Sequence, residues 1–249
     1  MSESDRTVLI TGVCGGIGSA TAAAFSEAGW RVIGTDLRQP ADHVRVDRFH
    51  LADVSRDGGV DELLGQLELA ELDGLVNNAA VQLDAPLVAT TDEMWSLVMN
   101  TNVRAMFQLI RGLHAPLAAR RGGIVNVSSV HAIATSANVA AYAISKGAVA
   151  ALTRTAALEL ALAGIRCNAV LPGAVMTPML EAGLSRRPNA RGPQGNLDDL
   201  VARTPLGFVA TPDQVAPSIV FLADARLSPY TTGQTLVIDG GATIHLSTE

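Results

Sequence analysis

The sequence predicts one α/β domain built on a doubly wound, mostly parallel sheet with helices on both faces. The 249 residues are 48% hydrophobic but only 4% aromatic, so most apolar residues are small aliphatic ones, which suit buried parallel strands covered by helices. Short runs rich in β-branched residues alternate with Ala- and Leu-rich stretches, an order typical of parallel strands joined by right-handed helical crossovers. The length suits a single domain, residues 1–249, and no repeat or linker divides it.

The elements of the first part follow from composition and turn signals. Residues 7–10 and 31–35 are predicted strands because they are short and rich in β-branched side chains. Residues 19–28 have helical composition and stop at Gly29, a natural C-cap. A third strand is predicted within residues 44–51, where the alternation of apolar residues is only partial.

The middle of the chain continues the alternation. A short helix is predicted at residues 60–69 and a fourth strand at residues 74–77. A long helix is predicted from residue 91 towards residue 120, because a threonine precedes Glu93 in the first turn. Residues 123–127 form the fifth predicted strand.

The last part carries one irregular stretch. A second long helix is predicted at residues 140–163 and a sixth strand at residues 165–171. Residues 215–223 are predicted as a helix and residues 235–238 as the last strand. The stretch between them, residues 173–212, is rich in Pro, Gly and Arg. A structureless segment of that length inside a domain is usually functional, so we expect a substrate-binding loop or lid there.

Charge and cysteine content exclude several classes of function. Lys and Arg number 18 against 24 Asp and Glu, a net charge of -6 with no basic patch, so nucleic acid is not an expected partner. The longest uncharged run, residues 122–145, contains polar residues throughout and does not predict a membrane helix. Cys14 and Cys167 are the only cysteines, which favours a reducing compartment, the cytoplasm. No His or Cys cluster has the spacing of a metal site.

A glycine-rich turn lies between the first predicted strand and the first predicted helix. It reads Thr11-Gly12-Val13-Cys14-Gly15-Gly16-Ile17-Gly18. Glycines permit a tight turn and the close approach of a pyrophosphate, and the helix N-terminus supplies free N–H groups and the positive end of its dipole. The order strand, turn, helix therefore predicts a Rossmann-type dinucleotide site.

Acidic residues after the next two strands refine this prediction. Asp36 closes the second strand, at the distance from Gly18 where a carboxylate accepts hydrogen bonds from the adenosine ribose. Its charge repels a 2′-phosphate, and Gly15 places no basic side chain in the turn, so the sequence favours NAD over NADP. Arg38 lies close by, either solvated or packed against adenine. Asp53 is either a contact of the adenine amino group or a surface turn residue.

A tyrosine and a lysine share one face at the start of the second long helix. Tyr142 and Lys146 are one helical turn apart. An ammonium beside a phenol favours the phenolate, which would move the tyrosine pKa from about 10 towards the working pH, as a general base requires. The strand before this helix ends in Ser128-Ser129, on the side of the sheet where we expect the cofactor.

Together these motifs resemble those of the classical short-chain dehydrogenase/reductase family over almost the whole chain. The matching segments are Thr11-Gly12-x-x-x-Gly16-Ile17-Gly18, Asn77-Asn78-Ala79-Ala80, Asn102, Ser129 with Tyr142, Lys146, Asn168, Pro172-Gly173 and Asp239-Gly240-Gly241. Ala80 departs from the family, which more often has Gly there. The resemblance implies a homotetramer that uses the two long helices and the C-terminal segment as interfaces.

The resemblance also implies a role for each catalytic residue. Tyr142 would exchange a proton with the substrate oxygen, and Ser129 would donate a hydrogen bond to orient it. Lys146 would bind the nicotinamide ribose and lower the pKa of Tyr142. Asn102 would hold a water that passes protons from Lys146 to solvent, or would only cap or kink its helix.

The same resemblance implies the residues that line the NAD site. Thr177 would lie near the carboxamide of the nicotinamide. The full set of expected cofactor contacts is Gly12, Cys14, Gly16, Ile17, Gly18, Asp36, Leu37, Asp53, Val54, Asn78, Ala79, Ala80, Tyr142, Lys146, Pro172, Gly173, Val175 and Thr177.

The residues of the expected substrate pocket do not decide between an anionic and an uncharged substrate. Its predicted contacts are Gln82, Ser129, His131, Val139, Tyr142 and Met179. Gln82 and His131 match residues that bind the substrate carboxylate in 3-hydroxybutyrate dehydrogenases, but Val139 replaces a lysine of those enzymes. His131 would then bind a hydroxyl or carbonyl, or only pack. Arg186, Arg187 and Arg191 are either solvated or meet an anionic substrate as the loop closes.

The sequence therefore predicts an NAD-dependent oxidoreductase that interconverts a secondary alcohol and a ketone. Alternatives within the family are a dehydrogenase of a small hydroxy acid or of a cyclic dihydrodiol. An apolar wall around Met176 and Met179 would suit the cyclic dihydrodiol. A reductase of imines or activated alkenes is disfavoured because such enzymes usually alter the Tyr or Ser. An alternative of another class is a non-catalytic nucleotide-binding sensor or scaffold, which loss of a catalytic residue would favour; none is lost.

Overall fold

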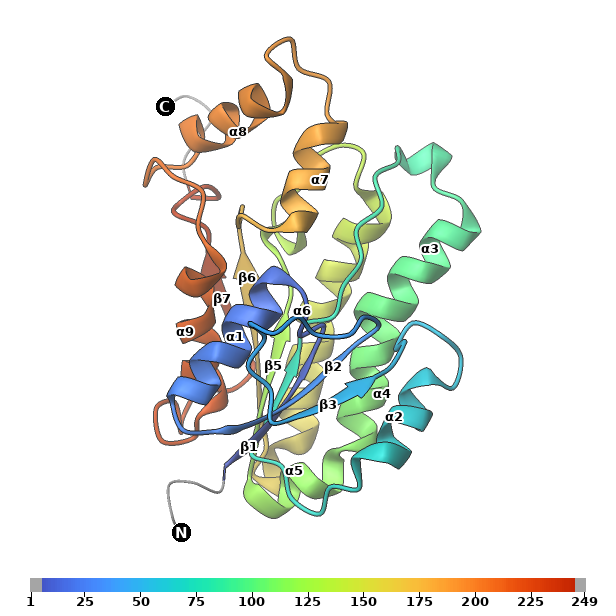
Figure 1. Cartoon of the computed structure of the whole chain (residues 1–249), viewed down its shortest axis with the longest axis vertical. Helices are drawn as coiled ribbons and strands as arrows, with labels where there is room; N and C mark the ends of the chain where they lie inside the picture. The colour runs from blue at the N-terminus through green and yellow to red at the C-terminus, as the bar shows by residue number, and fades with distance from the viewer. Residues whose placement is uncertain (1–5, 245–249) are drawn as a thin grey trace.

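The computed structural model describes residues 6–244 and folds them around one parallel sheet of seven strands (Figure 1). The strands are β1 (Thr7–Thr11), β2 (Arg31–Asp36), β3 (Arg48–Leu51), β4 (Gly74–Asn77), β5 (Gly123–Val127), β6 (Arg166–Pro172) and β7 (Thr235–Ile238). Their order across the sheet is β3-β2-β1-β4-β5-β6-β7. The order reverses between β1 and β4, which leaves a crevice beyond the carboxyl ends of these strands.

Helices cover both faces of the sheet and create two cores. One face carries α1 (Gly16–Glu27) and α9 (Pro212–Ala223), whose apolar residues pack with Val8 and Ile10 of β1. The other face carries α2 (Gly59–Leu67), α4 (Ala105–Gly112) and α6 (Ala140–Leu160). Their apolar residues form a second core with Leu9, the residue between Val8 and Ile10 in β1. Successive strand residues point to opposite faces, so near-continuous apolar strands fill both cores and confirm the doubly wound architecture.

The helix predicted at residues 91–120 is not continuous: the structure has three α-helices and one π-helical turn there. They are α3 (Asp92–Met99), the π-helical turn η3 (Asn100–Arg104), α4 and α5 (His114–Arg120). Thr91 begins α3 as predicted, because its hydroxyl accepts a hydrogen bond from the N–H of Met94. The π turn holds the buried Asn102, and turns of this kind inside helices are frequent at functional sites.

The predicted irregular stretch 173–212 contains two helices. They are α7 (Pro178–Arg186) and α8 (Gly192–Ala202), which Figure 1 shows beyond the carboxyl ends of the strands. Proline misled the prediction, because Pro178 and Pro193 lie in first turns, where the missing N–H costs nothing. The Thr177 hydroxyl also caps α7 by accepting from the N–H of Leu180.

The remaining differences concern boundaries. The first helix begins at Gly16 rather than at residue 19, because the glycine turn itself supplies the first helical turn. The third strand is limited to β3, and the predicted helix at 140–163 ends as α6 at Leu160, followed by the short turn η5 (Ala161–Ala163). Two further short turns are η2 (Leu87–Ala89) and η4 (Val130–Ala132). Within residues 6–244, none of the helices has the length and apolar content needed to span a bilayer.

Candidate functional site

The glycine turn between β1 and α1 leaves a helix N-terminus open. Gly12 has a φ of 66°, a conformation that favours glycine. A Cβ at Gly18 would lie 2.2 Å from the carbonyl oxygen of Gly12, so the turn closes only with glycine there. No side chain caps α1 and no acidic residue lies in its first turn. The first N–H groups of the helix therefore remain for an anion, and the turn fits a pyrophosphate.

Residues after β4 hold this turn in place. The Thr11 hydroxyl oxygen accepts from the N–H groups of Asn78 and Ala79, each at 3.0 Å. The Asn78 side-chain amide donates to the carbonyls of Thr11 and Gly12, also at 3.0 Å. The side chain of Asn78 thus braces the turn, and with half-buried Ala79 and Ala80 it lies beside the crevice. The sequence motif predicted no role for Thr11, although its position directly before the first glycine places it at the turn.

The carboxylate of Asp36 is fixed at the end of β2. It accepts a hydrogen bond from the N–H of Cys14 and another from the N–H of Arg38, each at 3.0 Å. The Arg38 Nε lies 3.6 Å from Asp36, and its side chain is largely exposed. Burial and the nearby Asp36 charge raise the pKa of the Cys14 thiol, so it is a poor nucleophile.

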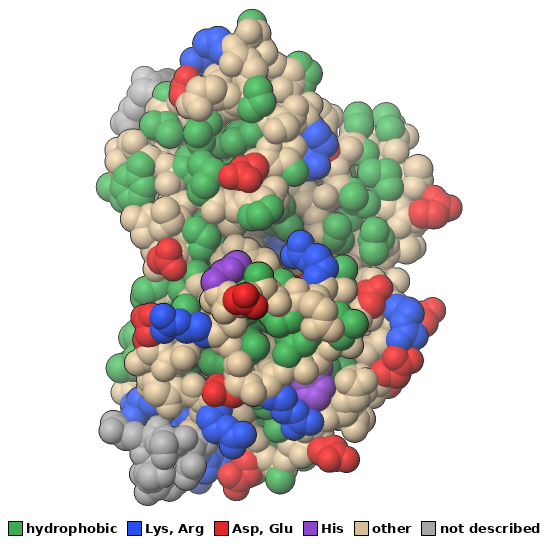
Figure 2. All heavy atoms as spheres, in the orientation of Figure 1, with side chains coloured by type: hydrophobic (Ala, Val, Ile, Leu, Met, Phe, Trp, Pro, Cys, Tyr) green, Lys and Arg blue, Asp and Glu red, His purple; other side chains and the backbone are tan. Residues whose placement is uncertain are grey.

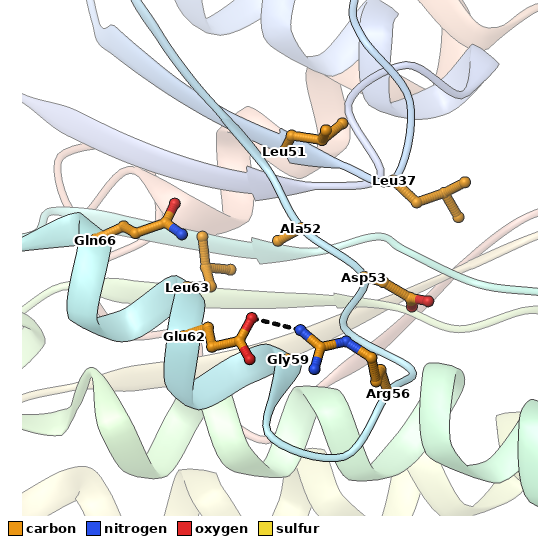
Figure 3. A pocket seen from close by; sticks show the side chains of 9 residues that line it. All are labelled: Leu37, Leu51, Ala52, Asp53, Arg56, Gly59, Glu62, Leu63 and Gln66. Atoms are coloured by element: carbon orange, nitrogen blue, oxygen red, sulfur yellow. Dashed lines mark hydrogen bonds and ion pairs between the residues drawn. The ribbon is translucent and has the colours of Figure 1, made fainter.

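A cavity of about 320 Å³ lies beside the position predicted for adenine (Figure 3). Leu37 and Asp53 line it, and the ion pair between Arg56 and Glu62 crosses one side. Asp53 accepts from the N–H and hydroxyl of Ser55 at 2.9 and 2.6 Å. Its carboxylate therefore organises a turn. The side chain of Val54 is buried in the core beneath α2, which leaves only its backbone for a ligand.

Ser129 and Tyr142 meet at the carboxyl edge of the sheet. Ser129 follows β5, Tyr142 lies on the first turn of α6, and both are buried. Burial raises the pKa of Tyr142 to about 12, while a hydrogen bond with Ser129 lowers it. Ser128 turns away, since its hydroxyl donates to the carbonyl of Lys146 at 2.9 Å. The structure thus brings together the pair that the sequence selected.

The expected effect of Lys146 on the phenol is absent from this structure. The Lys146 Nζ donates to the carbonyl of Val127 at 2.9 Å and lies 5.3 Å from the centroid of the Tyr142 ring. Complete burial lowers the pKa of Lys146 to about 7. The predicted shift of the tyrosine pKa towards neutrality is therefore wrong for the chain by itself, because burial outweighs the distant ammonium charge.

Asn102 uses its whole side chain as a brace. Its Oδ1 accepts from the N–H of Val81 at 2.8 Å, and its Nδ2 donates to the Val81 carbonyl and the Ser145 hydroxyl, each at 3.0 Å. The Ser145 hydroxyl in turn donates to the carbonyl of Tyr142 at 2.7 Å. The side chain joins the segment after β4 to α6, so any relay of protons at this position would have to use the backbone carbonyl.

The segment after β6 reaches the glycine turn. Pro172 ends β6, and the N–H of Gly173 donates to the carbonyl of Ile238 at 2.9 Å. Val175 is buried, whereas Thr177 faces the turn closely: a Cβ at Gly16 would lie 2.8 Å from the Thr177 Cγ2. The candidate nicotinamide residues therefore lie against the start of α1.

The candidate substrate residues surround Tyr142 unevenly. The His131 ring lies edge-on to the Tyr142 ring at a centroid distance of 5.6 Å, and its Nδ1 lies 2.9 Å from the Thr135 hydroxyl. Burial lowers the pKa of His131, with smaller effects of the Arg187 and Lys146 charges. Val139 is buried. The other two predicted contacts lie on neighbouring segments: half-buried Gln82 after β4 and partly exposed Met179 on α7.

An ion pair that no sequence motif predicted joins two of these segments. The Arg186 Nε donates to the Asp84 Oδ2 at 2.7 Å, and the Gln82 amide donates to the Asp84 Oδ1 at 2.9 Å. The end of α7 is thereby tied to the segment after β4. Within the described residues, no group of His, Cys, Asp and Glu could hold a metal ion.

Comparisons with known proteins agree with this geometry. A family model described as enoyl-(acyl carrier protein) reductase matches residues 12–243. The chain is 36% identical to the 3-oxoacyl-(acyl-carrier-protein) reductase FabG of Thermotoga maritima over 253 residues, which covers 96% of this chain and 98% of that protein. It is 34% identical to dehydrogenase/reductase SDR family member 6 of Xenopus laevis, covering 95% and 96% of the two chains. Cyclopentanol dehydrogenase of a Comamonas strain is also 34% identical, covering 96% and 97%.

Solved structures share the fold along the whole chain. Aldohexose dehydrogenase of Thermoplasma acidophilum has a TM-score of 0.90 at 27% identity, covering 98% of this chain and 96% of that one. L-sorbose reductase of Gluconobacter frateurii, solved with NADPH and L-sorbose, has a TM-score of 0.88 at 28% identity, covering 98% and 99%. A 4-hydroxyisoleucine dehydrogenase, solved with NADH, has a TM-score of 0.85 at 27% identity, covering 97% and 100%.

Proposed function

Since the chain belongs to the classical short-chain dehydrogenase/reductase family, we propose that it is an NAD-dependent oxidoreductase interconverting a secondary alcohol and a ketone. The convergence of Ser129, Tyr142 and Lys146 at the carboxyl edge of the sheet, beside the uncapped start of α1, carries the proposal. Family membership makes the protein an oxidoreductase of alcohol- or ketone-type substrates that uses a nicotinamide cofactor.

In the proposed reaction, two residues handle the substrate oxygen. Ser129 donates a hydrogen bond that orients the oxygen, and Tyr142 takes the hydroxyl proton as the C–H bond breaks and the C=O bond forms. When bound, NAD accepts the hydride, and the positive charge of its nicotinamide favours the phenolate. In the reverse direction, Tyr142 returns the proton to the ketone oxygen.

Two further residues prepare Tyr142 for this task. Lys146, with a pKa of about 7, is able to exchange a proton near neutral pH and to donate to the nicotinamide ribose. Asn102 is a positioning residue in this proposal: it fixes the start of α6 through Ser145, whose hydroxyl donates to the Tyr142 carbonyl.

The choice of NAD rests on Asp36. Its carboxylate is held by two backbone N–H groups in the position proposed for the adenosine ribose, and its charge would repel a 2′-phosphate. The related structures contain both NADPH and NADH, so this preference is a property proposed for this chain alone.

Residues 173–212 are proposed to act as a substrate-binding lid of this single domain. The base of the segment is narrow, because Val175 pairs with Ala210 and the N–H of Met176 donates to the Ala210 carbonyl at 2.8 Å. We also propose a homotetramer built on the helices of the α4 and α6 face and on the C-terminal segment.

Replacement of Tyr142 by Phe tests the mechanism. The phenol hydroxyl is the proposed proton acceptor, so kcat in a panel of secondary alcohols, hydroxy acids and cyclic diols should fall by about 10²–10⁴-fold. NAD binding, measured by calorimetry, should stay within a few-fold of the wild-type value, since only one oxygen atom is removed. A variant that binds NAD and turns over at the wild-type rate would show that Tyr142 is not the proton-transferring group.

A further inference from the structure

Two consecutive arginines at the end of α7 have different surroundings. Arg186 pairs with Asp84, and the distance from its Nε to the Asp84 Oδ2 is 2.7 Å. Arg187 is exposed, and among residues 6–244 its side chain has no hydrogen-bond or ion-pair partner. A charged guanidinium presents several donors in one plane. Arg187 has all of its donors available to an anion, whereas Arg186 already uses its Nε on Asp84.

The pair formed by Arg186 and Asp84 anchors the end of α7, next to Arg187. It ties the end of α7 to the segment after β4, which carries Gln82. Each Asp84 oxygen accepts one of these hydrogen bonds, from Arg186 or from Gln82. The charge of Arg187 also lowers the pKa of Asp84, so Arg187 lies near this carboxylate without being hydrogen-bonded to it. Figure 2 shows the surface narrowing to a recess between the α7–α8 end and the rest of the molecule.

The charge of Arg187 acts on the catalytic side of this recess. It lies close enough to lower the pKa of His131, whose ring is 5.6 Å from that of Tyr142. The other groups that face His131 contribute less positive charge near pH 7: the buried Lys146 has a pKa of about 7, and Arg186 is paired with Asp84. Asp84 is one negative charge beside two arginines, so a net positive charge remains at the end of α7.

We propose that Arg187 binds the carboxylate of a short hydroxy acid whose carbinol carbon lies at Ser129 and Tyr142. This inference rests on the proposed function and names its substrate class. A planar guanidinium matches a carboxylate through two parallel hydrogen bonds. The cation would come from α7 rather than from residue 139, where the buried Val139 supplies no charge.

Oxidation of paired acids and esters tests this proposal. The probes are 2- and 3-hydroxybutyrate and their methyl esters, compared by kcat/KM with NAD. Wild-type protein should prefer an acid over its ester by about tenfold or more, which is the effect expected of one charge-assisted hydrogen bond. Arg187→Gln should remove this preference and leave ester oxidation within about twofold. The matched control is Arg203→Gln, which removes the same charge from the exposed end of α8 and should keep the preference.

The outcomes separate this inference from the proposed function. If NAD raises the melting temperature and an ester is oxidised, but the acids are not preferred or Arg187→Gln keeps the preference, the inference is overturned alone. The same holds if NAD binds and neither acid is oxidised. If NAD neither raises the melting temperature nor supports oxidation of any alcohol, the proposed function fails and the inference falls with it.

Discussion

At the scale of single residues, burial decides how the candidate groups behave. Tyr142, Lys146 and Asn102 are almost inaccessible to solvent, and desolvation disfavours the charged form of a group whatever its neighbours. The motif of Tyr and Lys one turn apart therefore does not by itself supply a phenolate. We expect the bound cofactor to provide the missing positive charge.

A pH series tests the burial of Lys146. Unfolded lysine keeps its proton to about pH 10.4, whereas burial lowers the pKa of Lys146 to about 7 in the folded chain. Between these values the unfolded state binds more protons, so this residue makes the protein more stable as pH rises. Relative to Lys146→Met, wild-type unfolding free energy should increase between pH 7 and pH 9.5 by at most about 1.4 kcal/mol per pH unit.

The measurement is urea denaturation of both proteins without added cofactor. Other titrating groups are the same in the two proteins, so the difference between them isolates Lys146. A difference that is constant across this pH range would contradict a lowered pKa.

Asp36 is expected to decide the cofactor. Asp36→Ala removes the proposed ribose acceptor and the charge that repels a 2′-phosphate, so the ratio of kcat/KM for NAD to that for NADP should fall by about tenfold or more. Asp53→Asn is the control, since the Asp53 carboxylate organises its own turn and should leave the ratio nearly unchanged. A wild-type preference for NADP would refute this reading of Asp36.

At the scale of elements, two glycines of helices α1 and α2 have opposite expected effects. A Cβ at Gly18 would lie 2.2 Å from the Gly12 carbonyl oxygen, whereas a Cβ at Gly65 meets nothing within 4 Å. Gly18→Ala should therefore lower the melting temperature and weaken NAD binding. Gly65→Ala should stabilise the protein by about 0.5–1 kcal/mol, because alanine is the better helix former.

Thermal melts and NAD titrations of both variants check this pair. Equal effects of the two substitutions would mean that the close approach of α1 to the glycine turn is not needed for stability or for NAD binding. The comparison is sharp because both changes add one methyl group to a helical glycine.

At the scale of the whole molecule, apolar side chains remain exposed on helices α3, α4 and α6. Phe107 on α4 and Leu158 on α6 are 47% and 80% exposed, and Trp95 on α3 is 40% exposed. Exposed apolar patches mark interfaces when their residues are contiguous, and the proposed homotetramer would cover these side chains.

Phe107→Asp should lower the oligomeric state measured by light scattering, because it places a charge in the proposed interface. Val88→Asp, at an exposed position of η2 outside these helices, should leave the state unchanged. A wild-type protein that is monomeric at micromolar concentration would refute the proposed assembly.

The sequence by itself determined the order of the strands along the chain and the segments that carry the central motifs, but not helices α7 and α8. Period, β-branched content and glycine position are local signals, so β1, β4, β5 and β7 were predicted within one residue. The spacing to Tyr142 selected Ser129, and in the structure Ser129 is hydrogen-bonded to Tyr142 whereas the Ser128 hydroxyl donates to the Lys146 carbonyl. The catalytic role of Ser129 stays a prediction.

Only the tertiary structure decided properties that depend on distant neighbours. Burial by surrounding elements sets the pKa values of Tyr142 and Lys146. The Asn102 side chain is hydrogen-bonded to groups on two other segments, at Val81 and at Ser145. The ion pair between Asp84 and Arg186 joins residues far apart in the chain, so no local sequence pattern predicts it. Arg186 forms this ion pair and the neighbouring Arg187 does not, because folding brings only Arg186 within hydrogen-bond distance of Asp84.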